Sequence, residues 1–357
     1  MKKIVLILSV AALALASCVK TSDVYTGSPD SREIVLSPLN QPLTRSAVSG
    51  AQTSFPDQTI YVSAYQSAPA AKDYFGDIAF EKNYAGGSAS GASDNTWGGT
   101  TAQYWPLAAA TLNFLAVTEG PTGTTHQFGT EVAQSNPVTY EHYANQVVVT
   151  MADNITAQHD LMYSYAQASI TDALASFPNV TMTFHHALAW VNFTVKAGDA
   201  ATAAAITIKN VTLTGAKYSG TYTVTMPNYN STTNNLSTGL TASWDATAYG
   251  NASTAPKNVL SSDGSVALLT TSSSSVGEGI LVAPNPDNQA DSFTSISVKY
   301  SMGGSDYTHT FTPASLVLQP GKKYTFAMTF TLHEIRVVPS VEAWDDLTAT
   351  DVAIPSA

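Results

Sequence analysis

The chain has 357 residues, of which 44% are apolar and only 11% are charged, and its formal net charge is −11. Soluble proteins average about 25% charged residues, so this composition argues against charge-driven disorder, and the acidic balance argues against binding of nucleic acid through its phosphates. Because Cys18 is the one cysteine, the chain forms no internal disulfide and no four-cysteine zinc site. The length suits about two domains.

The first eighteen residues have the pattern of an export signal. Lys2 and Lys3 precede an apolar stretch, Ile4–Ala16, that is shorter than the about 20 residues of a membrane-spanning helix. The stretch leads through Ser17 into Cys18, which predicts a signal peptide over residues 1–17 and is similar to the lipobox of bacterial lipoproteins. We therefore expect Cys18 to be the lipid attachment site. The alternative is an ordinary export signal with an incidental cysteine.

The next segment combines one predicted strand with one exposed arginine. Arg32–Leu39 is rich in β-branched and apolar residues, and Pro38 within it favours an edge position in a sheet. Turn-forming and small residues surround Arg45, so a trypsin-like protease is expected to cut between Arg45 and Ser46. The alternative is a linker in which the arginine has no role.

The body of the chain is predicted to be all-β, because apolar and polar side chains alternate with a period of two. The clearest alternation is at Val191–Val195, Tyr222–Met226 and Tyr324–Phe330. Further strands are predicted at Thr59–Tyr65, Thr111–Val117, Gln146–Thr150, Val266–Thr270, Gly279–Ala283 and Ile296–Tyr300. Short strands between clusters of Gly, Pro, Asn and Ser favour β-sandwiches.

Two local patterns modify the strand prediction. The apolar phase shifts by one residue between Ile208 and Val211, which predicts a bulge near Asn210. Ala200–Ala205 is helix-forming but too short to be stable alone, and short helices are also expected within residues 140–175.

Two further segments are predicted to lie outside the strands. Gly86–Gly99 has the composition of a mobile surface loop. Phe177-Pro178-Asn179 interrupts the pattern, which places a domain boundary near residue 178. The two predicted domains are therefore residues 46–178 and 179–334.

Motifs of catalysis are not found in the sequence. It has no Gly-x-Ser-x-Gly nucleophile motif, no Gly-rich phosphate loop and no His-Glu-x-x-His motif. His185 and His186 are neighbours on a predicted strand, so they point to opposite faces and do not readily share a metal. Asp345 and Asp346 lack the spaced oxygen ligands of a calcium site. We therefore expect no enzyme, metal or cofactor, and a secreted hydrolase is the least favoured alternative.

The C-terminal segment, residues 335–357, is extended and moderately apolar. One interpretation is that it forms the last two strands of a sandwich. The other is that it offers a strand to another molecule by addition to a sheet edge. The pattern alone leaves both open.

Four stretches together resemble the fimbrillin family of Bacteroidales surface pili (type V pili). They are Tyr104-Trp105-Pro106 with Leu112–Ala116, then Thr183–Phe193, Leu318–Phe326 and Val341–Trp344. The resemblance implies two tandem transthyretin-like β-sandwich domains with few short helices. It also implies export as an outer-membrane lipoprotein, proteolytic removal of an N-terminal strand, and polymerisation by strand exchange at the cell surface.

Transferred to this chain, the resemblance assigns a role to each end. Residues 18–45 match a lipidated propeptide with a removable strand, with Cys18 as the acylated residue and the cut at Arg45–Ser46. Residues 335–357 match the donor strand, with its apolar positions at Val341, Ala343, Trp344, Leu347, Val352 and Ile354. The implied partners are other pilus subunits in a head-to-tail homopolymer, a trypsin-like processing protease and, before cleavage, the outer membrane.

The function expected on this basis is that of a structural pilus subunit that supports adhesion. A stalk position is favoured because a removable strand and a donor strand are both present. The nearest alternative is a tip or accessory subunit of the same pilus. The other alternative is a monomeric, lipid-anchored glycan-binding protein with stacking surfaces at Trp97, Trp105, Trp190, Trp244 and Trp344.

Overall fold

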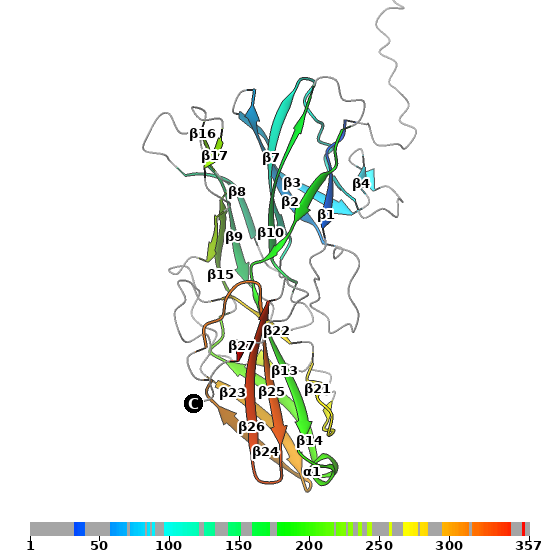
Figure 1. Ribbon diagram of the computed structural model, residues 1–357, viewed down its shortest axis with the longest axis vertical. Coiled ribbons are helices and arrows are strands. Elements are labelled where there is room, and N and C mark those ends of the chain that lie inside the picture. Colours follow the sequence, from blue (N-terminus) through cyan, green and yellow to red (C-terminus); the bar gives the residue numbers. More distant parts are fainter. Residues whose placement is uncertain are drawn as a thin grey trace, which may run out of the picture.

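The computed structural model describes most of the chain as short strands with one helix. The described residues are 32–39, 58–69, 72–82, 84–85, 88–89, 96–120, 125–132, 142–150, 159–171, 177–217, 219–225, 228–230, 235–237, 241–244, 257–258, 267–277, 279–284, 295–313, 316–343 and 352–353. Within them the helix is α1 (Ala200–Ala205), and the all-β prediction is confirmed. Figure 1 shows an elongated molecule with the first strands at one end and the last strands at the other.

The N-terminal half contains an eight-stranded sheet in the order β11-β1-β6-β3-β2-β7-β10-β12. Its strands are β1 (Val35–Leu39), β2 (Ile60–Ala68), β3 (Lys72–Lys82), β6 (Trp97–Gly99), β7 (Ala110–Thr118), β10 (Met162–Ile170), β11 (Val180–Thr183) and β12 (His185–His186). All neighbours pair antiparallel except β1 and β11, which are parallel. A buried apolar cluster that includes Phe80, Trp105 and Phe114 packs this sheet.

A four-stranded sheet in the order β18-β15-β9-β8 joins segments from both halves of the chain. Its strands are β8 (Thr125–Val132), β9 (His142–Thr150), β15 (Ser219–Thr225) and β18 (Thr241–Trp244). Two small ladders complete this end of the fold, namely β4 (Tyr84–Ala85) with β5 (Ser88–Ala89) and β16 (Asn228–Asn230) with β17 (Asn235–Ser237).

Two further sheets form the C-terminal half. One has the order β21-β13-β25-β26-β27 with β22 also on β13, and the other has the order β19-β14-β23-β24 with β20 also on β14. Their strands are β13 (Ala189–Ala197), β14 (Ile206–Thr214), β19 (Lys257–Asn258), β20 (Ala267–Leu268), β21 (Ser274–Ser275), β22 (Ile280–Val282), β23 (Ser295–Met302), β24 (Ser305–Phe311), β25 (Lys322–Phe330), β26 (Ile335–Ala343) and β27 (Val352–Ala353).

The core of the C-terminal half is built around the parallel pair β13 and β25. Phe193 lies opposite Phe326 in the ladder, and their rings stack with centroids 5.6 Å apart. Phe330 packs edge-on against Tyr300 of the other sheet at 5.6 Å. The loop before β25 is fixed by Tyr324, whose hydroxyl donates to the Val317 carbonyl at 2.9 Å. Burial raises the pKa of Tyr324 to about 12.

The helix and the bulge confirm two local predictions. Asp199 caps α1 by accepting a hydrogen bond from the Thr202 backbone N–H at 2.7 Å, and this bond lowers the pKa of the Asp199 carboxyl. The ladder between β14 and β23 shifts register between Ile208 and Asn210, where the apolar phase changes in the sequence.

Short helices within residues 140–175 stay a prediction, because residues 151–158 and 172–176 lie outside the described part of the chain; the described part of this range forms β9 and β10, each paired on both sides. Two other local predictions are wrong. Trp97, at the end of the predicted surface loop, is fully buried in β6. Pro38 lies in an internal strand rather than in an edge strand. Proline is tolerated there because the ladder between β1 and β6 ends at Leu36 and needs no N–H from Pro38.

The predicted division near residue 178 stays a prediction. The pairing groups β11 and β12 with the sheet of the preceding strands. The predicted strand segments, by contrast, coincide with β2, β7, β9, β20, β22 and β23.

Candidate functional site

The position of β1 in the N-terminal sheet is the candidate site. On one side β1 runs parallel to β11, with Leu36 opposite Val180. On the other side it runs antiparallel to β6, with Leu36 opposite Trp97. We call this position, between β11 and β6, the β1 slot; it lies in the upper half of Figure 1.

Backbone hydrogen bonds extend the slot before β1 begins. The Ile34 N–H donates to the Gln103 carbonyl at 2.7 Å, and the Trp105 N–H donates to the Arg32 carbonyl at 2.8 Å. Glu33 forms a bridge with Tyr104 between these two bonds. The segment that contains β1 is therefore bonded to three separate parts of the chain.

The inward side chains of this segment belong to the N-terminal core. Ile34 and Leu36 are both 0% exposed and lie in the same buried cluster as Trp97, Trp105, Val180 and Met182. Val35 and Ser37 alternate with them and are partly exposed. Burial of each large aliphatic side chain stabilises the fold by ~1.5–3 kcal/mol, so β1 contributes substantially to this core.

The end of the slot that precedes Ile34 holds an acidic residue. Glu33 is only 4% exposed although it carries a carboxylate. Next to it the Tyr74 hydroxyl donates to the carbonyl of Tyr104. Burial raises the pKa of Tyr74, and the nearby Arg32 guanidinium opposes this shift more weakly. The position that precedes the two buried aliphatic residues thus holds a nearly buried acidic side chain, and its bridge partner Tyr104 accepts a hydrogen bond from Tyr74.

The C-terminal segment has two parts with unequal pairing. β26 pairs antiparallel with β25 along its whole length, from Ile335 opposite Phe330 to Ala343 opposite Lys322. Two of the predicted donor residues, Val341 and Ala343, therefore lie in a strand of their own sheet. Val352 lies in β27, which pairs with β26 only at Ser340 and Val341.

The remaining predicted site residues lie outside the described part of the chain. These are Cys18 for lipid attachment, Arg45 and Ser46 for processing, and Trp344, Leu347 and Ile354 of the donor strand. Their roles stay predictions. Asp345 and Asp346, considered for calcium, also fall outside it.

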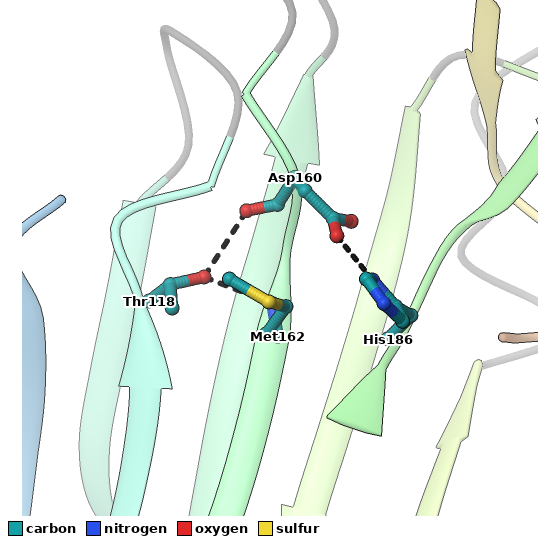
Figure 2. A network of polar contacts seen from close by, with 4 residues as sticks. All are labelled: Thr118, Asp160, Met162 and His186. Carbon is teal, nitrogen blue, oxygen red and sulfur yellow. Dashed lines mark hydrogen bonds and ion pairs between the residues drawn. The ribbon is translucent and has the colours of Figure 1, made fainter. Parts of the chain in front are cut away.

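The two neighbouring histidines lie as the strand geometry predicts, with His185 exposed and His186 buried. His186 Nδ1 is hydrogen-bonded to Asp160 Oδ2. Thr118 ties the same segment to β7, because its Oγ1 donates to the Asp160 carbonyl at 3.1 Å and accepts from the Met162 N–H at 2.8 Å (Figure 2). Among the residues that the structure describes, no three His, Cys, Asp or Glu side chains come together as metal ligands.

The sequence did not point to Asp160 as a partner of His186. The two residues are 26 positions apart and come together only because β10 and β12 pair. The arrangement is a structural link between strands, since both side chains are nearly inaccessible at 0% for His186 and 7% for Asp160.

The tryptophans do not offer stacking surfaces in the described part of the chain. Trp97, Trp105, Trp190 and Trp244 are all buried, with at most 6% exposed. The indole N–H of Trp97 donates to the Gln58 carbonyl at 3.1 Å, and that of Trp244 to the Ala187 carbonyl at 2.8 Å. These four side chains are core residues, so the glycan-binding alternative loses the feature on which it rested; Trp344 lies outside the described residues.

Comparison with known proteins identifies the family. The sequence pattern described as fimbrillin-like matches residues 44–344, which is most of the chain. The chain belongs to the fimbrillin-like family. No curated protein sequence matches it.

Solved structures similar to this fimbrillin-like chain come from several bacteria. A candidate cell adhesion protein of Bacteroides uniformis is 18% identical, with 89% of this chain and 100% of that chain covered and a TM-score of 0.50, which supports the β-sandwich fold. A fimbrial assembly protein of Parabacteroides distasonis is 10% identical over 90% and 98% of the two chains, with a TM-score of 0.39. The fimbrial anchor protein Mfa2 of Porphyromonas gingivalis is 10% identical over 89% and 98%, with a TM-score of 0.29.

Membership in a family of structural fimbrial and adhesion proteins supports a role as a pilus subunit. It indicates other pilus subunits as partners and the cell surface as the location. In the described residues, no helix is both long and apolar enough to cross a membrane.

Proposed function

We propose that this fimbrillin-like protein is a stalk subunit of a surface pilus that polymerises by donor-strand exchange. It is exported as a lipoprotein acylated at Cys18 and cut between Arg45 and Ser46, which removes β1. The C-terminal tail of a neighbouring subunit then enters the β1 slot. The observation that carries this proposal is the internal position of β1, a five-residue strand paired on both sides and upstream of the predicted cut.

Removal of β1 leaves a slot that requires a new occupant. The edges of β11 and β6 lose their backbone partners, and unpaired buried N–H and carbonyl groups are unfavourable. The space left by Ile34 and Leu36 exposes apolar surface around Trp97. Refilling these two positions returns about 3–6 kcal/mol at ~1.5–3 kcal/mol each, before the entropic cost of association.

The pairing pattern supports the end of the tail as the donor. β26 is bonded to β25 at every residue, so its release would break a full ladder. β27 is paired at only two residues and can leave β26 at far lower cost. We therefore restrict the donor to residues 344–357, which follow β26 and contain Leu347, Val352 and Ile354.

The proposed geometry leads to a filament rather than a closed dimer. Donor and acceptor are different surfaces, since β1 lies in the N-terminal sheet and β26 in the C-terminal sheet at opposite halves of the molecule (Figure 1). Such a heterologous contact repeats without closing. Before the cut, β1 fills the slot and the precursor stays monomeric and attached to the membrane by its lipid.

Cleavage of the purified precursor tests this proposal. Trypsin-like digestion of the wild-type protein should give a new N-terminus at Ser46 and then high-mass ladders that resist mild denaturant. Arg45→Ala should stay monomeric and lipidated, whereas the control Lys20→Ala should behave like the wild type, because Lys20 lies before the removable strand. Normal filaments from Arg45→Ala would refute the assigned cut.

A further inference from the structure

The β1 segment carries a recognisable order of side chains in the slot. A nearly buried acid, Glu33, is followed by two fully buried aliphatic residues at the next and third positions, Ile34 and Leu36. Glu33 is only 4% exposed, so the slot encloses an acidic side chain at this position. The slot therefore has one polar position followed by two apolar positions.

The tail contains the same order once. Within residues 344–357, an acid followed by large aliphatic residues at the next and third positions occurs only at Asp351-Val352-Ala353-Ile354. At Asp346 the first aliphatic residue is Leu347, but the third position is Ala349. The match is between a slot that the structure describes and the sequence of the segment proposed to fill it.

We propose that Asp351 sets the register of the donor tail in the β1 slot, an inference that rests on the proposed function. Asp351 takes the position of Glu33, and Val352 and Ile354 take those of Ile34 and Leu36. Ala353 takes the position of Val35, which is partly exposed and needs no large side chain. A slip of one residue would turn both aliphatic side chains away from the core.

The alignment also fixes the direction of the incoming strand. With Asp351 first, the tail runs as β1 does, parallel to β11 and antiparallel to β6. The reverse direction, with Ile354 at the Ile34 position, would place Pro355 at the polar position of Glu33. In the assigned direction Pro355 falls at Ser37, which lies past the end of the β6 ladder but is paired with Thr181 of β11.

Four tail variants measured by polymerisation after protease cleavage test this register. Asp351→Leu and Ile354→Ala should each slow chain growth at least tenfold, and Asp351→Glu should restore the rate. The matched control Asp346→Leu should leave the rate within twofold of the wild type, because Asp346 does not enter the three assigned positions.

A competition experiment separates the register from folding defects of the variants. A synthetic peptide of residues 349–357 should block growth of the cleaved wild-type subunit, and its Asp351→Leu form should need at least tenfold more peptide. If the wild-type subunit does not polymerise, the proposed function fails. If it polymerises but the Asp346 variant is the slow one, or all variants grow normally, the register is refuted while strand exchange stands.

Discussion

Truncation of one buried side chain in β1 tests how the slot is held in the uncut precursor. Leu36 is 0% exposed and lies opposite both Trp97 and Val180, so alanine at this position leaves a cavity between β11 and β6. At buried sites, replacement of leucine by alanine lowers the free energy of unfolding by ~2–5 kcal/mol. A free-energy change of ~1.4 kcal/mol changes an equilibrium constant tenfold. A loss of about 3 kcal/mol in the stability of the β1 contacts therefore raises the fraction of molecules with β1 released by about 100-fold.

Hydrogen exchange of the β11 and β6 amides measures this release directly. Leu36→Ala should accelerate exchange in both strands and lower the urea midpoint of the precursor. Val35→Ala is the matched control, because Val35 is in the same strand but is partly exposed on the other face, and it should change exchange much less. Equal effects of the two variants, or none in β11 and β6, would refute the assignment of Leu36 as the residue that holds β1.

Two further predictions concern the stability of the fold. Gly279 has φ +79°, and a Cβ added there would lie 2.3 Å from Trp190 Nε1, whereas Gly304 has φ +82° with no atom near an added Cβ. In urea unfolding, Gly279→Ala should therefore lower the free energy of unfolding by ~1–3 kcal/mol more than Gly304→Ala. Asp160→Ala removes the hydrogen-bond partner of the buried His186 Nδ1 and should lower the free energy of unfolding by about 1–3 kcal/mol. A loss no larger than that of the exposed Asp306→Ala would contradict a structural role.

Local alternation in the sequence was sufficient to predict several of the longer strands. Tyr324–Phe330 falls within β25, and the phase change after Ile208 coincides with the register shift at Asn210. Both features depend on which face of a strand meets the core, and neighbouring residues alone carry that information. The same local logic separated exposed His185 from buried His186.

The errors arose where distant segments decide the outcome. Trp97 lies in a Gly- and Ser-rich stretch, but pairing of β6 with β1 and β3 draws it into the core. Pro38 is tolerated inside the sheet because the β6 ladder ends before it. The partner of His186 is set by the pairing of β10 with β12, which no local pattern contains. For the same reason, the sequence indicated a removable strand but not which strands would lie beside it.

Covalent linkage explains why cleavage, rather than affinity alone, would control the exchange. In the precursor, β1 and the slot belong to one chain, and flexible linkage gives an effective concentration on the order of millimolar. A tail from another subunit that fills the same three side-chain positions lacks this linkage, so it cannot displace β1 from the uncut precursor. After the proposed cut, the segment with β1 is no longer linked to the slot and loses this advantage. The tail remains attached to a subunit held in the growing filament, so similar contacts then favour the tail. Similar side chains at Glu33–Leu36 and Asp351–Ile354 are therefore compatible with a directed exchange, because proteolysis changes which of the two is linked to the filament.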